Sequence, residues 1–144
     1  MQYRVNPKNG ERISALGLGC MRFPGALGRP DQRQARDIIS RAVERGINYL
    51  DTAYLYPGNE ACVGAALEEL GVRDRVLVAT KLPHGSVRGA PDLDRILDEQ
   101  LRRLRTDHVD YYLIHNVTSP GQWDRLRELG IEGWVARQRD AGRI

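Results

Sequence analysis

The eight residues RVLVATKL, at positions 75–82, decide the fold of this 144-residue chain. They form the clearest strand of the sequence, a short apolar run that is rich in β-branched side chains. What lies between this strand and its neighbours decides how the strands pair. Helical segments on both sides would imply parallel strands joined by crossovers.

Both flanking segments have the spacing of amphipathic helices. In the helix predicted over residues 91–104, apolar side chains recur every three or four positions. They are Leu93, Ile96, Leu97, Leu101 and Leu104. The helix predicted over 60–70 has one apolar face and ends at Gly71. That face contains Val63, Ala66, Leu67 and Leu70.

Further strands are predicted beyond these helices, at INYLDT (47–52), VDYYLIHN (109–116) and SALGLGCM (14–21). A helix that begins at an Asp31 N-cap and stops at Gly46 connects the strand at 14–21 to the strand at 47–52. Strands that alternate with helices in this way form parallel sheets with right-handed crossovers. The fold class is therefore α/β, with four strand–helix units in one domain, 1–144.

The remaining segments complete the prediction. Residues 2–5 and 11–13 form a short hairpin around the turn NPKNG. The stretch FPGALGRP, 23–30, is expected to be a loop. Ser119 and Pro120 open a last helical region that runs through Val135 and is broken at Gly130.

Composition excludes several classes of function. The net charge is only +3 and the basic residues are scattered, which indicates solvated faces rather than a nucleic-acid interface. The polar start MQYRVNPKNGERIS is no signal peptide, and no apolar run approaches the roughly 20 residues of a membrane helix. Cys20 and Cys62 form no CxxC pair, so neither a disulfide framework nor a metal site is expected. We expect a cytoplasmic protein without metal. The chain also lacks a strand followed by GxGxxG, which disfavours a Rossmann fold.

Four chemically active side chains follow the predicted strands: Asp51, Tyr56, Lys81 and His115. The carboxyl ends of parallel strands meet at one rim, where α/β barrels carry their active sites. An ammonium group beside a phenol favours the phenolate, an aspartate can hold that ammonium, and a histidine can donate a hydrogen bond to a carbonyl. Together they suggest a proton donor aimed at a carbonyl oxygen.

Taken singly, each of these residues has an ordinary structural explanation. Asp51 could form a turn, a tyrosine at position 54 or 56 could pack on the core, Lys81 could be a surface residue, and His115 could be structural. Lys81 stands out because only two of the 22 basic residues are lysines. Four accidents at four strand ends are much less plausible. The other histidines, His84 and His108, are not grouped with further chemically active residues at a strand end and are expected to be structural.

The sequence resembles the N-terminal half of an aldo-keto reductase. The resemblance lies in GLGCMR (17–22), GINYLDTAYLYPGNEACVGAAL (46–67), VLVATKLP (76–83) and VDYYLIHN (109–116). It implies that Asp51, Tyr56, Lys81 and His115 are a catalytic tetrad, with Tyr56 as proton donor because it follows the aspartate by five residues. It also implies reduction of an aldehyde or ketone by NADPH, with NADH as the alternative.

The same resemblance implies that Gly19, Cys20, Met21 and Thr52 contact the nicotinamide end of the cofactor. The longer stretch YRVNPKNGERISALGLGCMRFP, 3–24, resembles a bacterial branch of the family that often carries a C-terminal iron–sulfur segment. The expected fold is thus the N-terminal half of a (β/α)8 TIM barrel preceded by a short hairpin. A complete barrel of this type needs about 250 residues.

This length raises an alternative to catalysis. The chain stops where a fifth strand would begin, so we expect a fragment, or a half-barrel that pairs with a second copy or a complementary half. An inert half or an assembly module is the competing hypothesis; a metal-dependent hydrolase is disfavoured because no carboxylate–histidine cluster has ligand spacing. An open sheet would expose its inner face, where we expect the apolar side chains Leu16, Leu18, Tyr112 and Ile114.

Overall fold

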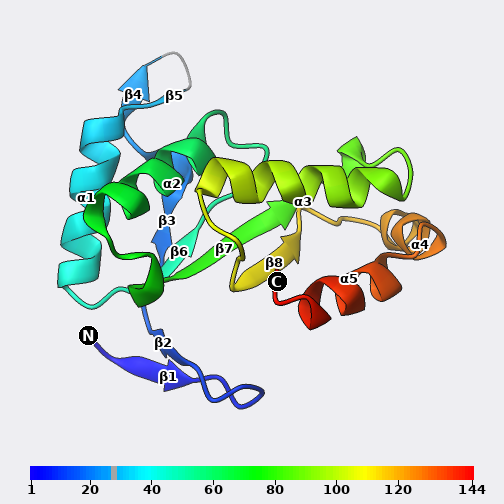
Figure 1. Ribbon diagram of the computed structural model, residues 1–144, viewed down its shortest axis with the longest axis horizontal. Coiled ribbons are helices and arrows are strands. Elements are labelled where there is room, and N and C mark those ends of the chain that lie inside the picture. The colour runs from blue at the N-terminus through cyan, green and yellow to red at the C-terminus, as the bar shows by residue number, and fades with distance from the viewer. Residues whose placement is uncertain (27–28) are drawn as a thin grey trace.

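Four parallel strands form the central sheet of the computed structural model, which describes residues 1–26 and 29–144 (Figure 1). They lie in the order β3 (Leu18–Gly19), β6 (Tyr49–Asp51), β7 (Leu77–Leu82) and β8 (Tyr111–Ile114). In the register, Gly19 pairs with Asp51, Asp51 with Ala79, and Lys81 with Leu113. The prediction of parallel strands in an α/β fold is confirmed, and the carboxyl ends of all four strands share one edge.

Helices connect consecutive strands and cover one face of the sheet (Figure 1). The connecting helices are α1 (Gln32–Glu44), α2 (Asn59–Leu70) and α3 (Pro91–Leu104), and the chain continues after β8 into α4 (Pro120–Glu128) and α5 (Ile131–Asp140). Val78 and Leu82 of β7 are fully buried in the core between sheet and helices. None of the helices in the described ranges is long and apolar enough to cross a membrane.

The helix ends follow from local chemistry. Asp31 accepts a hydrogen bond from the backbone nitrogen of Gln34 at 2.8 Å, which confirms the predicted N-cap of α1. Gly46, Gly71 and Gly130 have φ angles of 85°, 62° and 79°, in the left-handed region that favours glycine. They follow α1, follow α2 and separate α4 from α5, as the sequence predicts.

The contact between α2 and α3 requires a glycine at position 64. A Cβ atom there would lie 2.5 Å from the carbonyl oxygen of Arg103 and 2.5 Å from the carbonyl carbon of Leu104. Gly64→Ala should therefore lower the free energy of unfolding by about 1–3 kcal/mol, because the helix backbones must move apart. Gly133→Ala in α5 is the control: its Cβ would find no atom closer than 3.8 Å, so a gain of about 0.5–1 kcal/mol is expected. Urea denaturation followed by circular dichroism measures both, and equal effects would contradict the packing argument.

The N-terminal hairpin lies against the amino-terminal edge of the sheet (Figure 1). It consists of β1 (Tyr3–Val5) and the antiparallel β2 (Arg12–Ser14). Asn48, just before β6, accepts from the backbone nitrogen of Ser14 and donates to the carbonyl of Arg12, both at 2.7 Å. The Tyr111 hydroxyl donates to Glu11 at 2.7 Å. The hairpin is thus tied to both the inner and the edge strands.

Three expectations need correction. The predicted strand 14–21 is confined to β3, because Cys20–Arg22 form a 3-10 turn, η1. The predicted loop 23–30 contains a tight antiparallel pair, β4 (Gly25–Ala26) and β5 (Arg29–Pro30); positions 27 and 28 lie outside the described residues. The structure also contains two more 3-10 turns, η2 (Arg73–Arg75) and η3 (His84–Ser86), which flank β7 and correct no expectation.

The third correction concerns the face of the sheet that the helices leave uncovered. Leu18, Tyr112 and Ile114 pack against the helix-side core, so they do not form the exposed patch that we expected; of the four residues named, only Leu16 is exposed, at 63%. Side chains alternate between the two faces of a strand. The uncovered face therefore carries Tyr111, which lies 5.2 Å from the ring of Tyr49 between centroids, and the half-exposed Leu113.

Candidate active site

An ion pair joins the ends of β6 and β7. The Lys81 ammonium donates to Asp51 Oδ1 at 2.6 Å and to the carbonyl oxygen of Thr52 at 2.7 Å. Both residues lie on the uncovered face of the sheet, because Asp51 pairs with Ala79 and Lys81 is two positions further along the strand. The lysine side chain is 13% exposed and that of Asp51 is 35% exposed, so the ammonium is largely shielded from water and is held in one place by a partly exposed carboxylate.

Tyr56 and His115 complete the cluster. Tyr56 lies in the turn between β6 and α2, and its ring centroid is 5.2 Å from Lys81 Nζ. The His115 ring, just after β8, meets the Tyr56 ring edge to face, with 5.7 Å between centroids and an interplanar angle of 90°. The structure thus brings together all four side chains that the sequence placed at this rim.

His115 is held in its neutral form by its surroundings. Burial lowers the pKa of its imidazole below the ordinary 6.5, and the nearby Lys81 charge lowers it further. Its Nδ1 atom is buried and has no hydrogen-bond partner among the described residues. If the single proton sits on Nε2, only a lone pair is left unpaired inside, and the N–H can donate to a ligand.

The titration of His115 should follow from these causes. We expect its imidazole to titrate below 6.5, and Lys81→Met to raise that midpoint, because a nearby positive charge is removed. The unfolded chain then binds more protons between the native and unfolded pKa values, so stability falls as pH decreases through this interval. NMR of the histidine ring carbons measures the midpoint, with the chain unfolded in urea as the reference. An unchanged midpoint in Lys81→Met would contradict the assigned cause.

The four residues expected to contact a cofactor differ in accessibility. Gly19 and Met21 are exposed, whereas Cys20 and Thr52 are fully buried. The Thr52 hydroxyl donates to Asn59 Oδ1 at 2.6 Å, and Asn59 in turn donates to the carbonyl oxygen of Cys20 at 2.7 Å. Burial, followed by the charge of Asp51, raises the pKa of the Cys20 thiol to about 12. Cys20 and Thr52 are inaccessible as whole residues, and their carbonyl oxygens already accept hydrogen bonds from Asn59 and Lys81. Of the four expected contacts, only Gly19 and Met21 are therefore open to a ligand in this structure.

A buried polar network behind Lys81 escaped the sequence analysis. Glu60 is 1% exposed and accepts hydrogen bonds from the Thr80 hydroxyl at 2.6 Å and the Gln100 amide at 2.8 Å. Arg103 donates to the other carboxylate oxygen at 3.2 Å. The same Gln100 amide reaches the carbonyl oxygen of Lys81 at 3.1 Å. The network thereby connects α2 and α3 to the strand that carries the lysine.

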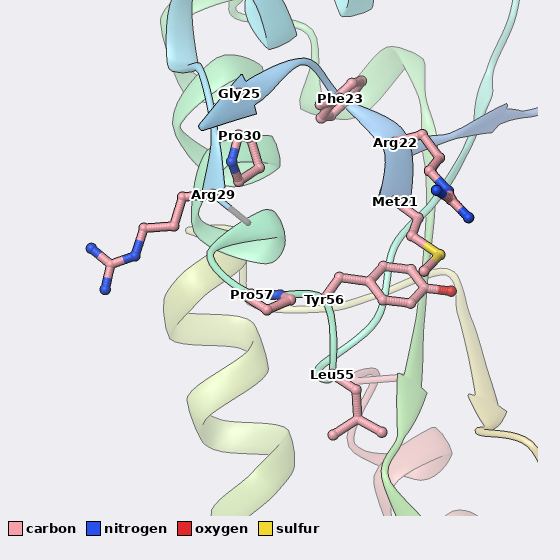
Figure 2. Close-up of a pocket in the computed structure, with 9 residues that line it drawn as sticks. All are labelled: Met21, Arg22, Phe23, Gly25, Arg29, Pro30, Leu55, Tyr56 and Pro57. Atoms are coloured by element: carbon pink, nitrogen blue, oxygen red, sulfur yellow. The ribbon is translucent and has the colours of Figure 1, made fainter. Parts of the chain in front are cut away.

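Tyr54 points toward Arg103 of the buried polar network and not toward the cluster around Lys81. The guanidinium carbon of Arg103 lies 4.4 Å from the centroid of its ring, and the ring packs against the core. A pocket of about 260 Å³ lies instead beside Tyr56 (Figure 2). Its walls come from η1, from the β4–β5 pair and from the turn after β6.

The sequence of this chain is similar to those of known proteins of one family. A sequence model of the aldo/keto reductase family matches residues 15–136. Aldo-keto reductase YhdN of Bacillus subtilis is 33% identical over 125 residues, which is 80% of this chain and 38% of that protein. Protein tas of Escherichia coli is 33% identical over 135 residues, 80% of this chain and 38% of its own length.

Solved structures show the same relation. A Bacillus halodurans aldo-keto reductase, determined in its holo form, superposes with a TM-score of 0.77 at 32% identity, covering 97% of this chain and 47% of that one. A putative aldo-keto reductase from Pseudomonas aeruginosa gives 0.84 at 28% identity, with 99% and 57% covered. The chain belongs to the aldo/keto reductase family, a family of oxidoreductases. It spans about half the length of these solved relatives and less of the curated ones.

Proposed function

We propose that the protein reduces an aldehyde or ketone to an alcohol with NADPH, as part of a complete barrel. The observation that carries this proposal is the cluster of Tyr56 and His115 around the Lys81–Asp51 ion pair. Membership of the aldo/keto reductase family supports it. NADH is the alternative cofactor.

Each side chain has a distinct role in the proposed reaction. Neutral His115 donates a hydrogen bond to the substrate carbonyl and orients it. Tyr56 gives its hydroxyl proton to the carbonyl oxygen as the oxygen gains negative charge. Lys81, held by Asp51, stabilises the phenolate that remains on Tyr56. Bound NADPH would supply the hydride that the carbonyl carbon needs, because no side chain here can supply one.

The residues near the ion pair fit the nicotinamide end of such a cofactor. A Cβ at Gly19 would meet no atom within 4 Å, so a flat ring can approach its backbone closely beside Asp51. Met21 would contribute its exposed side chain. Cys20 and Thr52 are fully buried, so they would support the site from behind, where the Cys20 carbonyl accepts from Asn59 and the Thr52 carbonyl accepts from Lys81.

The proposed architecture is a half-barrel over residues 1–144. The uncovered face of the sheet carries the ion pair together with Tyr49, Tyr111 and Leu113, and it would turn inward in a closed barrel. Four more strand–helix units, from a complementary half or a second copy of this chain, would cover that face. The shares of 47% and 57% of the solved relatives support this proposal.

The test is NADPH oxidation by the purified chain with a panel of small aldehydes, with and without an added second half. Turnover by the chain alone would mean that it assembles a working site by itself. If no preparation shows turnover and none binds NADPH, the proposed reduction is rejected.

The half-length match also supports a second candidate, a non-catalytic half that acts in assembly. Size-exclusion chromatography separates the two ideas. A defined dimer without turnover would favour assembly, whereas a dimer that oxidises NADPH would favour two halves completing one barrel.

A further inference from the structure

The pocket beside Tyr56 is lined by a positively charged side chain that has no role in the proposed reaction. Arg22, the last residue of the 3-10 turn η1, lines this pocket together with Tyr56. Figure 2 shows its guanidinium group on the same side of the pocket as the Tyr56 hydroxyl, with Met21 beside both. Arg29, also in the lining, points away on the opposite side.

The charge of Arg22 is not compensated locally. Within the described ranges, Arg22 takes part in no side-chain hydrogen bond or ion pair, and the same is true of Arg29. Arg22 differs from Arg29 in lying on the side of the Tyr56 hydroxyl. The pocket lining contains no carboxylate, and the nearby Asp51 is engaged by Lys81. An uncompensated positive charge at the mouth of a pocket favours an anionic ligand.

The rest of the pocket is apolar. Met21 and Leu55 are each 55% exposed and lie on opposite sides of the Tyr56 ring, with the Leu55 side chain directed away from Arg22, and Phe23 and Pro57 complete the apolar lining (Figure 2). Methionine adapts its shape to different aliphatic ligands. A volume of about 260 Å³ accommodates a small molecule with a short carbon chain.

We propose that this pocket selects carbonyl compounds that carry a carboxylate, and that Arg22 binds the carboxylate. A guanidinium group presents a planar pair of N–H donors that matches the two oxygens of a carboxylate. The carbonyl would point to the Tyr56 hydroxyl and the carbon chain would lie on Met21, which is beside both Arg22 and that hydroxyl. The reaction of such a compound rests on the proposed function; its binding by Arg22 does not.

Binding can be measured without turnover, because the chain has only two methionines. In protein labelled with ¹³C at the methionine methyl groups, Met21 reports on the pocket and Met1 serves as the internal reference. The ligands are 2-oxopentanoate and 4-oxopentanoate, compared with the neutral pentan-2-one of the same chain length. We expect at least one oxo acid to shift the Met21 signal with a Kd about tenfold lower than that of the ketone, an advantage that shrinks as salt is added.

Three variants test the role of Arg22. Arg22→Gln should remove the advantage of the oxo acid and leave the binding of pentan-2-one unchanged. Arg22→Lys should retain only part of it, because an ammonium group lacks the planar fork. Arg29→Gln is the matched control and should bind like the wild type, since Arg29 points away from the Tyr56 hydroxyl.

The proposal is overturned if neither oxo acid binds more tightly than pentan-2-one. It is also overturned if the advantage survives Arg22→Gln, or if Arg29→Gln abolishes it equally. Tight oxo-acid binding without NADPH oxidation in any preparation, with or without an added second half, would reject the proposed reduction and leave the role of Arg22 intact. Turnover with no preference for the oxo acids would support the proposed reduction and overturn the role of Arg22.

Discussion

Replacing Tyr56 by phenylalanine should lower carbonyl reduction by about 10²–10⁴-fold, the range that a positioned general acid contributes. The substitution removes only the hydroxyl group. The ring can still contact Lys81 and His115, so the packing of the site and the affinity for NADPH should remain close to those of the wild type. The turnover of Tyr56→Phe and of the wild type is measured as the rate of loss of NADPH absorbance in matched preparations. Their affinity for NADPH is measured by fluorescence titration.

Tyr54→Phe provides the control for the Tyr56 experiment. Tyr54 lies only two positions away but stacks on Arg103, outside the cluster, so its turnover should remain within about twofold of the wild type. Unchanged turnover in Tyr56→Phe would show that another group donates the proton. A loss of NADPH binding in that variant would indicate a structural effect and not a lost proton donor.

Glu60→Ala is expected to have the largest effect on stability, a loss of about 3–5 kcal/mol in the free energy of unfolding. The carboxylate is buried and is contacted by Thr80, Gln100 and Arg103. Removing it leaves the buried Thr80 and Gln100 without their shared acceptor. Arg103, whose side chain is 29% exposed, loses one partner and keeps Glu99. Because Gln100 also donates to the carbonyl of Lys81, the change should reach the strand that carries the ion pair.

Urea denaturation gives the free energy of unfolding, and two variants frame the result. Glu68→Ala removes a carboxylate from the same helix, but the Glu68 side chain is 62% exposed and, among the described residues, pairs only with Arg105, so the loss should stay within about 1 kcal/mol. Glu60→Gln keeps an acceptor oxygen and should fall between the two. Similar losses in Glu60→Ala and Glu68→Ala would mean that the buried network contributes little.

The periodic parts of the sequence predicted the fold well. Helix α3 begins and ends where the spacing of Leu93, Ile96 and Leu97 placed it, because an amphipathic helix declares its buried face in its own sequence. The β4–β5 pair could not be found in this way. It depends on Gly25, where a Cβ would lie 1.9 Å from the carbonyl oxygen of Arg29, and such a close approach leaves no periodic pattern.

The site was predictable to the extent that it lies at strand ends. The sequence placed Asp51, Lys81 and His115 at one rim because parallel strands end together. The polar network was missed because charged and amide side chains are usually exposed. One signal was nevertheless present: Gln100 occupies the apolar stripe of α3, and Glu60 the apolar stripe of α2. A polar residue on an apolar stripe indicates a buried hydrogen-bond partner.

The bond between Glu11 and Tyr111 has a consequence for the order of folding. Neighbouring strands pair residues only about 30 positions apart, so each new strand can join its predecessor soon after it is synthesised. The hairpin can attach early to Asn48, but Glu11 must wait for a partner 100 positions further along the chain. Closing that long loop comes late. The hairpin, which precedes every strand of the central sheet in the chain, is thus among the last of these elements to complete its native contacts.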